Sequence, residues 1–431
     1  MFSFCSSRRP SWSGTMRRAE TIERLYLDFD GFFASVMQQA MPHLRGRPVG
    51  VIPFDGSAAD ATVVIACSKE AKALGCSNVM RVPDARAKCP DMVFVTQRPD
   101  LFRRAHNTLV NEITCEIPIE TVKSIDELSC VLDKSTIAEP EALAARIKAR
   151  IRQNVGDQIT CSIGFAANRL LAKVACKMDK PNGVTIWHPE NMPTPLLPHS
   201  LEVIPGIGAR MQERLSAAGI VSMEDLWKSQ PKQLRAIWGN VNGERMWYAL
   251  HGYDVYAMPT ARGMFGHGRV LPPDKRDSKS ASAFSRVLLT KAARRMRRDG
   301  FFASKLWLAL DMRHGAWYAE RDLPAVKDDP ACLAALKLLW DKANRELPPR
   351  HEIIRVFVNL SELSPGNARQ LDLLINDDAE RQKCEVLTDT IDNLNRKFGK
   401  RVVTLGEWTP PGEYAGAKIA YNRIPSAEDF M

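Results

Sequence analysis

An apolar run that contains two carboxylates constrains this chain more than any other feature of its sequence. The segment "LYLDFDGFFASV" (residues 25–36) begins like a buried strand, and Asp28 and Asp30 lie inside it. A buried carboxylate without a partner is costly, so it is normally paired, bound to a metal or avoided. The segment predicts a strand over 22–30 and a helix over 31–41, and it raises the question of what stabilises the two aspartates.

A second acidic motif, "SIDE" (residues 124–127), is also embedded in a strand-like stretch. Only the fold could bring Asp126 and Glu127 next to Asp28, at the ends of neighbouring strands. Three carboxylates at one place repel one another, and hard divalent cations such as Mg²⁺, which prefer oxygen ligands, relieve that repulsion. Two such ions could clamp the attacking and leaving oxygens of a phosphoryl transfer. From spacing alone, solvated acids at strand ends are the better explanation of the pattern.

Strands that alternate with helices predict a layered α/β domain in the first half of the chain. After it, the proline-rich stretch "NMPTPLLPHS" (191–200) indicates a linker to a short helical region that ends near residue 253. Residues 267–360 read as βαββαβ, and an apolar helix is expected at 386–398. In the first half, strands are also expected at 61–68, 92–97, 124–133 and 159–167, and helices at 69–76, 100–116, 140–155 and 168–178.

The segment "IPGIG" (204–208), followed by a helical pattern, is typical of the turn of a helix-hairpin-helix. Gly206 and Gly208 would let the backbone approach a phosphate, which the N–H groups at the helix start would bind. A GxG turn by itself is a weak signal, and an ordinary tight turn remains the alternative.

Positive charge is concentrated in one part of the chain. The net charge is +10, and residues 261–300 alone carry eleven lysines and arginines against three acids. This concentration favours a surface that binds nucleic-acid phosphates without reading bases, although a solvated helix face is the simpler reading of any charge run. Helical spacing places Lys291, Arg294 and Arg298 on one face, and Arg269 belongs to the same basic region.

The ten cysteines include no CxxC pair, which is typical of reduced thiols in the cytoplasm. No apolar run approaches the roughly 18 residues that span a bilayer, so no membrane partner is expected. Residues 1–20 are polar and basic, and we expect a disordered tail rather than a signal peptide. Met1 and Met16 are both candidate starts.

In order and spacing, these motifs resemble the Y-family translesion DNA polymerases over about residues 22–400. "YLDFDGFFASV" and "SIDE" resemble the first two palm motifs, "CSIGFAANRLLAKVACKMDKPNGV" the third, and "VIPGIGARMQERLSAAGI" the thumb. "EAKALG" (70–75) is similar to the fingers of the UmuC-like subgroup, to which the DNA polymerase V catalytic subunit belongs, and some features are DinB-like. The resemblance implies an α+β multidomain right hand with a ferredoxin-like palm, small fingers, a helix-hairpin-helix thumb and a βαββαβ little finger. The implied boundaries are a tail at 1–20, a palm at 21–34 and 98–188, fingers at 35–97, a thumb at 189–256, a little finger at 262–362 and a C-terminal tail at 363–431.

The resemblance also implies roles for single residues. Phe33 falls at the steric-gate position that excludes a ribose 2′-OH, with a core phenylalanine as the alternative. Lys72 and Lys180 match basic residues that contact the triphosphate of a dNTP. Asp30 is not a metal ligand in the family pattern. The implied ligands of two Mg²⁺ ions, with Mn²⁺ as a substitute, are the catalytic carboxylates Asp28, Asp126 and Glu127 and the backbone carbonyl of Phe29.

The segment "QLDLLI" (370–375) resembles a sliding-clamp-binding peptide. Gln370, Leu371 and Leu374 would be its anchors, although the usual terminal aromatic residue is missing. An ordinary amphipathic segment is the alternative. The C-terminal tail beyond it would offer a surface to accessory proteins.

The function implied is template-directed, low-fidelity synthesis across DNA lesions, with primer-template DNA and dNTP as partners and a place in the SOS response. Two alternatives are open. A non-catalytic DNA- and clamp-binding subunit of a mutagenic complex would have lost one carboxylate, and none is lost. A nucleotidyl cyclase shares the two-acid palm, but the thumb motif and the basic region argue against it.

Overall fold

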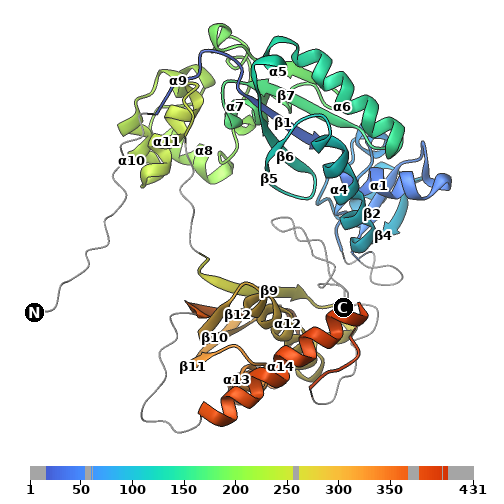
Figure 1. Cartoon of the computed structure of the whole chain (residues 1–431), viewed down its shortest axis with the longest axis vertical. Coiled ribbons are helices and arrows are strands. Elements are labelled where there is room, and N and C mark those ends of the chain that lie inside the picture. The colour runs from blue at the N-terminus through green and yellow to red at the C-terminus, as the bar shows by residue number, and fades with distance from the viewer. Residues whose placement is uncertain are drawn as a thin grey trace, which may run out of the picture. The chain divides into compact units, whose positions relative to one another are not determined.

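The computed structural model describes residues 16–53, 60, 62–255, 262–366, 378–399 and 401–405. The chain forms two compact units, Met1–Met258 and Pro259–Ile419, each with its own core (Figure 1). Among the helices of the described residues, none combines the length and the apolar character that crossing a bilayer requires.

A five-stranded sheet forms the centre of the first unit, in the order β5-β6-β1-β7-β8. β1 runs antiparallel to both of its neighbours, β6 and β7, whereas β8 is parallel to β7. β7 is buried along its whole length, and such strands read as continuous apolar runs in a sequence. The strands are β1 (Arg24–Phe29), β5 (Ile119–Val122), β6 (Glu127–Val131), β7 (Cys161–Ala166) and β8 (Val184–Ile186).

Helix α7 lies unusually close to this sheet because of one glycine. A Cβ on Gly164 of β7 would lie 2.2 Å from the carbonyl oxygen of Ala172 on α7, so no other residue fits there. The helix begins where the Asn168 side chain accepts a hydrogen bond from the N–H of Leu171, at 3.0 Å. The helices around the sheet are α1 (Phe32–Ala40), α4 (Pro99–Thr114), α5 (Lys134–Ala138), α6 (Pro140–Asn154) and α7 (Arg169–Ala175).

A smaller three-stranded sheet, in the order β3-β2-β4, lies in the region predicted as fingers. Its core is built from buried apolar side chains such as Ile52, Cys67 and Val82. The expected strand at 61–68 is shorter than predicted, because Val63 makes only an isolated bridge to Arg81. The elements are β2 (Val49–Ile52), β3 (Ala66–Cys67), α2 (Lys69–Ala73), α3 (Val82–Lys88) and β4 (Val93–Thr96).

Four short helices follow the proline-rich linker and complete the first unit. They are α8 (Ala209–Ala217), α9 (Met223–Lys228), α10 (Pro231–Trp238) and α11 (Val241–Leu250), and they bury leucines against one another. Residues 16–20 pair with the end of this region: Arg18 forms a bridge with Tyr253, and Ala19 is buried. The prediction that residues 1–20 form one disordered tail is therefore wrong for residues 16–20, while residues 1–15 lie outside the described part of the chain.

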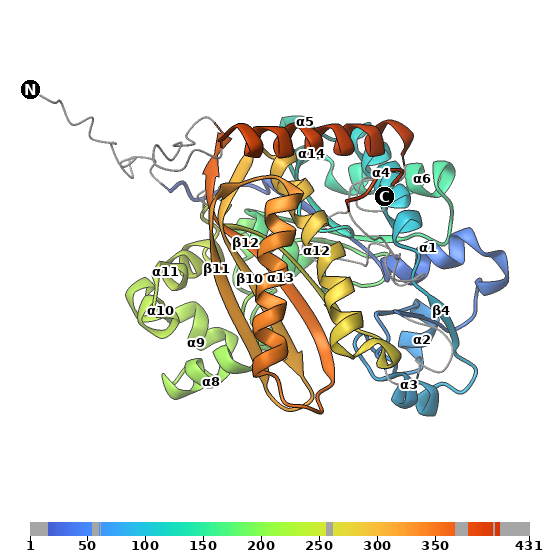
Figure 2. The same cartoon turned by 90° about the horizontal axis from the view of Figure 1, so that it is seen from below.

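The second unit contains a four-stranded antiparallel sheet, in the order β11-β10-β12-β9. Helices α12 and α13 lie next to each other on one face of this sheet, and α14 runs across them (Figure 2). The predicted βαββαβ order is confirmed, and so is the α+β multidomain fold class. The elements are β9 (Met264–Val270), α12 (Ser278–Arg298), β10 (Phe301–Met312), β11 (Ala316–Val326), α13 (Asp329–Glu346), β12 (Ile353–Pro365) and α14 (Asp378–Phe398).

Candidate active site

The two acidic motifs meet at the end of the central strand of the first unit. Asp28 on β1 lies directly opposite Glu127 on β6, and the N–H of Phe29 donates a hydrogen bond to the carbonyl oxygen of Asp126, at 2.9 Å. Strands that are far apart in sequence thus bring together the residues that the sequence analysis grouped. The antiparallel register accounts for this, because it places the end of β1 against the beginning of β6.

A lysine of α7, Lys173, forms an ion pair with the carboxylate of Glu127. The Lys173 ammonium group lies 2.8 Å from both oxygens of Glu127, and the Tyr26 hydroxyl donates to Glu127 Oε2 at 2.9 Å. Burial acts to raise the pKa of Glu127, but the hydrogen bonds and charge of Lys173 outweigh it and lower that pKa. Burial and the charge of Glu127 raise the pKa of Tyr26, so the phenol stays protonated. Lys173 and Tyr26 were not singled out from the sequence, although Tyr26 lies within the first acidic motif.

A second lysine is paired with Asp28. Lys180 contacts Asp28 Oδ1 through its ammonium group, and the two side chains are 32% and 16% exposed. Burial raises the pKa of Asp28 to about 6, with Asp126 and Glu127 adding to the effect and Lys180 opposing it. Burial acts to lower the pKa of Lys180, but Asp28 outweighs it and raises that pKa.

The residues around Asp28 fit a divalent cation in their chemistry. They offer carboxylate oxygens, the donors that Mg²⁺ prefers, and they already hold two ammonium groups against these carboxylates. In the part of the chain that the structure describes, no three acidic, histidine or cysteine side chains converge as a ready ligand set. Instead, the Lys173 ammonium group lies against Glu127 and the Lys180 ammonium group against Asp28.

Asp30, the second aspartate of the opening segment, has a different environment. It is only 9% exposed, and its carboxylate accepts hydrogen bonds from the Ser162 hydroxyl at 2.8 Å and the Thr160 hydroxyl at 3.0 Å. A third bond comes from the backbone N–H of Asn182, at 2.8 Å. Asp30 is thus satisfied by neutral donors and takes no part in the bonding of the Asp28–Glu127 pair.

Of the predicted nucleotide-binding residues, Phe33 lies on α1, Lys72 on α2 and Lys180 in the turn between α7 and β8. Phe33 on α1 is 5% exposed, and its ring packs edge-on against Phe102 with centroids 4.9 Å apart. Lys72 is exposed on α2. Gly31, which precedes α1, has a φ of +54°, a conformation that favours glycine. The aromatic packing of Phe33 shows that it is part of a core cluster as well as a candidate steric gate.

A groove of about 700 Å³ leads to Glu127 between the sheet and helices α7 and α11. Its walls carry the basic side chains of Lys123, Arg169 and Arg245, in addition to Lys173. Five basic side chains line the groove against three acidic ones, and an excess of positive charge attracts a phosphate backbone. Sequence reasoning missed these residues, because they are scattered over three elements and form no run.

The predicted phosphate turn precedes α8. Gly206 has a φ of +98°, which requires glycine, and Gly208 stands at the N-cap of α8 with no atom within 4 Å of the place where a Cβ would be. An open helix start of this kind exposes first-turn N–H groups toward an anion. Contact of Gly206 and Gly208 with DNA stays a prediction.

The predicted basic face of the second unit is largely covered. Lys291 is 6% exposed, and Arg294 forms an ion pair of 3.4 Å with Asp392 of α14. Arg269 is 7% exposed and lies over the ring of Phe284, and burial lowers its pKa to about 10. The expectation of an exposed phosphate-binding face is therefore wrong for Lys291, Arg294 and Arg269. Arg298 is exposed beside Asp299, and its contact with DNA stays a prediction.

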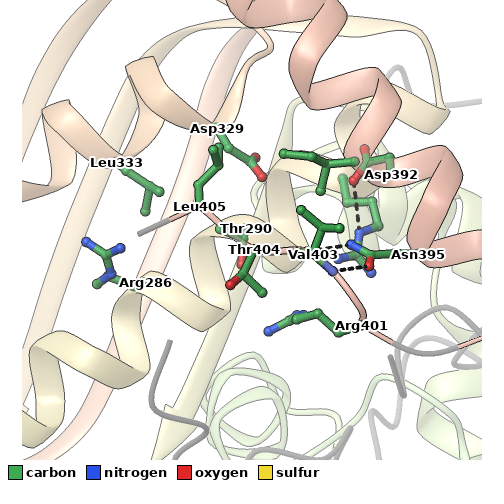
Figure 3. Close-up of a pocket in the computed structure, with 12 residues that line it drawn as sticks. Arg286, Thr290, Asp329, Leu333, Asp392, Asn395, Arg401, Val403, Thr404 and Leu405 are labelled. Carbon is green, nitrogen blue, oxygen red and sulfur yellow. Dashed lines mark hydrogen bonds and ion pairs between the residues drawn. The ribbon is translucent and has the colours of Figure 1, made fainter. Parts of the chain in front are cut away.

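Helix α14 and residues 401–405 close over α12 and α13 around a small hollow of about 40 Å³. In Figure 3, Asp392 and Asn395 of α14 point down toward this hollow, where the Asn395 side chain binds the backbone of Val403. Burial, together with the charge of Arg294, lowers the pKa of Arg401 in its wall to about 10. The sequence alone could not predict this cover, because its residues lie about 100 positions from α12. The predicted clamp-binding residues Gln370, Leu371 and Leu374 lie outside the described residues.

Comparisons with known protein families match three segments between residues 27 and 373. Residues 27–177 match the impB/mucB/samB family, residues 202–254 the DNA polymerase-iota thumb domain, and residues 262–373 the impB/mucB/samB family C-terminal domain.

Curated relatives match most of the chain. DNA polymerase IV of Moorella thermoacetica is 32% identical over 390 residues, which are 88% of this chain and 94% of that protein. DNA polymerase IV of Pelotomaculum thermopropionicum is 28% identical over 90% of this chain and 96% of its own length. Among solved structures, a Y-family DNA polymerase chimera of Dbh and Dpo4 has a TM-score of 0.65 at 23% identity, covering 79% of this chain and 99% of the chimera.

Opposed carboxylates on a central sheet, a helix-hairpin-helix and a βαββαβ unit define a right-handed nucleic-acid polymerase. Since a relative that is 32% identical is matched over 94% of its length, the chain belongs to the Y-family DNA polymerases. It is a DNA-directed DNA polymerase of the translesion class, so the alternatives of an accessory subunit and a cyclase fall away. The relatives named DNA polymerase IV fit the DinB-like part of the prediction, and nothing confirms the UmuC-like placement.

Proposed function

We propose that this polymerase adds a nucleotide at the end of β1, with Asp28, Asp126 and Glu127 as its catalytic residues. The observation that carries the proposal is the direct pairing of Asp28 with Glu127 across two strands, beside the basic groove. In the reaction, the primer 3′-oxygen forms a bond to the α-phosphorus of the dNTP, and the bond from that phosphorus to the bridging oxygen of the β-phosphate breaks. Pyrophosphate leaves, and the proton of the 3′-hydroxyl is released.

Two Mg²⁺ ions, with Mn²⁺ as a substitute, would be held by these three carboxylates and the carbonyl oxygen of Phe29. When bound, such ions neutralise the phosphate charge and lower the pKa of the 3′-hydroxyl. The protein side of the site supplies hard oxygen donors on rigid strands, so the reacting groups are held in place with little reorganisation. Lys173 and Tyr26 keep the Glu127 carboxylate ionised and oriented until substrate arrives.

The incoming dNTP would be held by the residues next to β1. Lys180 would release the Asp28 carboxylate and bind the triphosphate instead. Lys72 on α2 would contact the same phosphates. Phe33 would pack under the sugar and exclude a 2′-hydroxyl. The support for these roles is that Phe33 lies in the first turn of α1, just after the strand that carries Asp28, and that Lys180 already reaches the Asp28 carboxylate.

Primer-template DNA would lie in the groove walled by Lys123, Arg169 and Arg245, with the turn at Gly206 and Gly208 holding a phosphate of the same strand. A related structure is described as an insertion ternary complex of Dbh DNA polymerase, with a TM-score of 0.54 and 23% identity. That likeness supports a fold suited to primer-template DNA and dNTP. We assign the palm to 21–34 and 98–188, the fingers to 35–97, the thumb to 189–256 and the little finger to 262–362.

Two further partners belong to this proposal. Residues 370–375 would bind a sliding clamp, and the C-terminal region would bind accessory proteins of a damage response. The support is the sequence motif itself and its position between β12 and α14.

The double variant Asp126→Ala with Glu127→Ala tests the catalytic assignment. Loss of two of the three carboxylates should abolish nucleotide addition in a primer-extension assay with Mg²⁺, while primer-template binding measured by fluorescence anisotropy stays within about twofold, because the basic side chains of the groove are kept. Glu120→Ala is the matched control, since Glu120 lines the same groove without belonging to the acidic motifs. Extension by the double variant near the wild-type rate would refute the assignment.

A further inference from the structure

Asp30 is buried next to the proposed site, yet the proposed mechanism assigns it no role. Its two oxygens accept three hydrogen bonds, two from hydroxyls of Thr160 and Ser162 and one from the backbone N–H of Asn182. The bonds to Thr160 and Ser162 join the end of β1 to the beginning of β7, its neighbour in the sheet. The bond to Asn182 is different, because it reaches the turn between α7 and β8.

That turn, residues 180–183, is held tightly in an unfavourable conformation. Asn182 has a φ of +60°, in the left-handed region that few non-glycine residues adopt. The Lys148 ammonium group binds the turn from the other side, donating to the carbonyl oxygens of Asn182 and Gly183. A conformation of this kind persists only where the surroundings enforce it, and such residues cluster at functional sites.

The turn begins with Lys180, whose ammonium group reaches the carboxylate of Asp28. The hydrogen bond from the Asn182 N–H to Asp30 anchors the turn two residues after Lys180. It therefore fixes the point from which the Lys180 side chain extends. We propose that Asp30 is a positioning residue for this polymerase: it fixes the 180–183 turn so that Lys180 is aimed at the dNTP triphosphate. The inference rests on the triphosphate role of Lys180 proposed above.

A carboxylate suits this role better than other side chains. Its two oxygens offer about four acceptor sites and no donor, so one group can take hydroxyls on β7 and a backbone N–H on the turn at the same time. Hydrogen bonds to an ionised acceptor are also stronger than neutral ones. An asparagine keeps one acceptor oxygen and can donate to a hydroxyl, so it preserves the geometry in part.

The test is a double-mutant cycle read by dNTP affinity without chemistry. The enzyme is bound to a primer-template whose primer ends in a dideoxynucleotide, and the Kd of the correct dNTP is measured by fluorescence for the wild type, Asp30→Ala, Lys180→Ala and the double variant. Misplacing a contact group costs on the order of 10- to 100-fold, so Asp30→Ala should raise the Kd by that factor. The double variant should be no weaker than Lys180→Ala alone, because the two residues act through one contact.

The outcomes separate this inference from the function on which it rests. If Lys180→Ala leaves the Kd unchanged, the triphosphate role of Lys180 fails and the inference fails with it. If Lys180→Ala weakens binding, but the factors by which the two single variants raise the Kd multiply in the double variant, only the positioning role of Asp30 is overturned. An unchanged Kd in Asp30→Ala overturns it as well.

Two further variants keep the inference testable if Asp30→Ala does not fold. Asp30→Asn should stay within a few fold of wild type, because one oxygen still accepts from the turn; a loss as large as that expected for alanine would show that charge matters and not the anchored turn. Lys148→Met removes the other anchor and should raise the Kd only when Lys180 is present. Arg152→Met, an exposed position one turn later on α6, is its matched control and should leave the Kd at the wild-type value.

Discussion

Asp28 and Glu127 are each paired with a lysine, and this pairing sets the charge of the site. Lys180 lies on Asp28 and Lys173 on Glu127, so the strand end is nearly neutral without any added cation. The two carboxylates differ in protonation: burial raises the pKa of Asp28 to about 6, whereas Lys173 keeps the pKa of Glu127 low. Asp28 is therefore the carboxylate of this pair that takes up a proton nearer to neutral pH.

The raised pKa of Asp28 predicts a pH dependence of stability in the metal-free protein. Because the folded pKa is about 6 and the ordinary value is 3.8, the folded state binds the extra proton; the contribution is complete below pH 3.8 and is lost as the pH rises through 6. At pH 7 the ionised Asp28 should cost up to about 3 kcal/mol. Urea unfolding in EDTA should show that Asp28→Asn is more stable than the wild type at pH 7, and that this gain is about half as large at pH 5. An equal gain at both pH values would contradict it.

Phe33→Ala should admit ribonucleotides and also weaken the core. The ring is 5% exposed and packs on Phe102 and Phe32, so its removal should cost about 3–5 kcal/mol of stability. The measurement is the ratio of kcat/KM for dNTP to kcat/KM for rNTP. A loss of folded enzyme lowers both values by the same factor and leaves their ratio unchanged. Phe32→Leu, in the same aromatic cluster, should lower stability and leave the ratio unchanged. If both variants keep the wild-type ratio, Phe33 is a core residue only.

At the scale of elements, α14 is part of the second unit and not a loose extension. Arg297 of α12 is only 4% exposed in its side chain and forms ion pairs with Asp392 of α14 at 2.8 Å and with Asp329 of α13 at 2.7 Å. Lys327 and Asp389 add a pair of 2.9 Å at the edge. One buried arginine thus connects three helices.

Arg297→Ala should destabilise the second unit by about 3–5 kcal/mol, because it leaves Asp329 buried without its cation and leaves Asp392 with Arg294 alone. Arg298→Ala, the adjacent exposed arginine, is the matched control and should change stability by less than about 0.5 kcal/mol. Hydrogen–deuterium exchange resolved by peptide should show faster exchange in α12, α13 and α14 for Arg297→Ala alone. Similar exchange in the two variants would mean that the ion pairs do not hold α14 in place.

Local patterns predicted the elements well and their packing partners poorly. The βαββαβ order and the strand that carries Asp28 follow from short-range periodicity, which is a property of a few neighbouring residues. The same periodicity placed Lys291 and Arg294 on one helix face correctly, but it could not show that α14 covers that face. Lys173 was missed for a related reason: its partner lies on another strand, and only Gly164 lets α7 come close enough.

At the scale of the whole molecule, the chain joins a polymerase site in its first unit to a second unit that carries the candidate clamp motif. Changing Gln370, Leu371 and Leu374 to alanine should weaken binding to a sliding clamp at least about tenfold, because a few apolar anchors dominate such interfaces. Synthesis on short primers without clamp should keep its wild-type rate. Surface plasmon resonance with immobilised clamp measures the first and primer extension the second. Asp377→Ala, just beyond the motif, is the control, and clamp binding by the triple variant at wild-type strength would refute the motif.

The ion pairs of Arg297 have a consequence for how residues 367–377 meet a partner. β12 ends at Pro365 and α14 begins at Asp378, and both belong to one packed unit. The residues that flank this segment, Gly366 and Asp378, therefore both belong to the same packed unit. Much of the entropy of loop closure has already been lost on folding, so a partner that takes up this segment loses less of it than it would with the same residues in a free linear peptide. A partner would therefore bind the motif more tightly in the intact chain than in a free peptide, because the second unit is already folded on both sides of it.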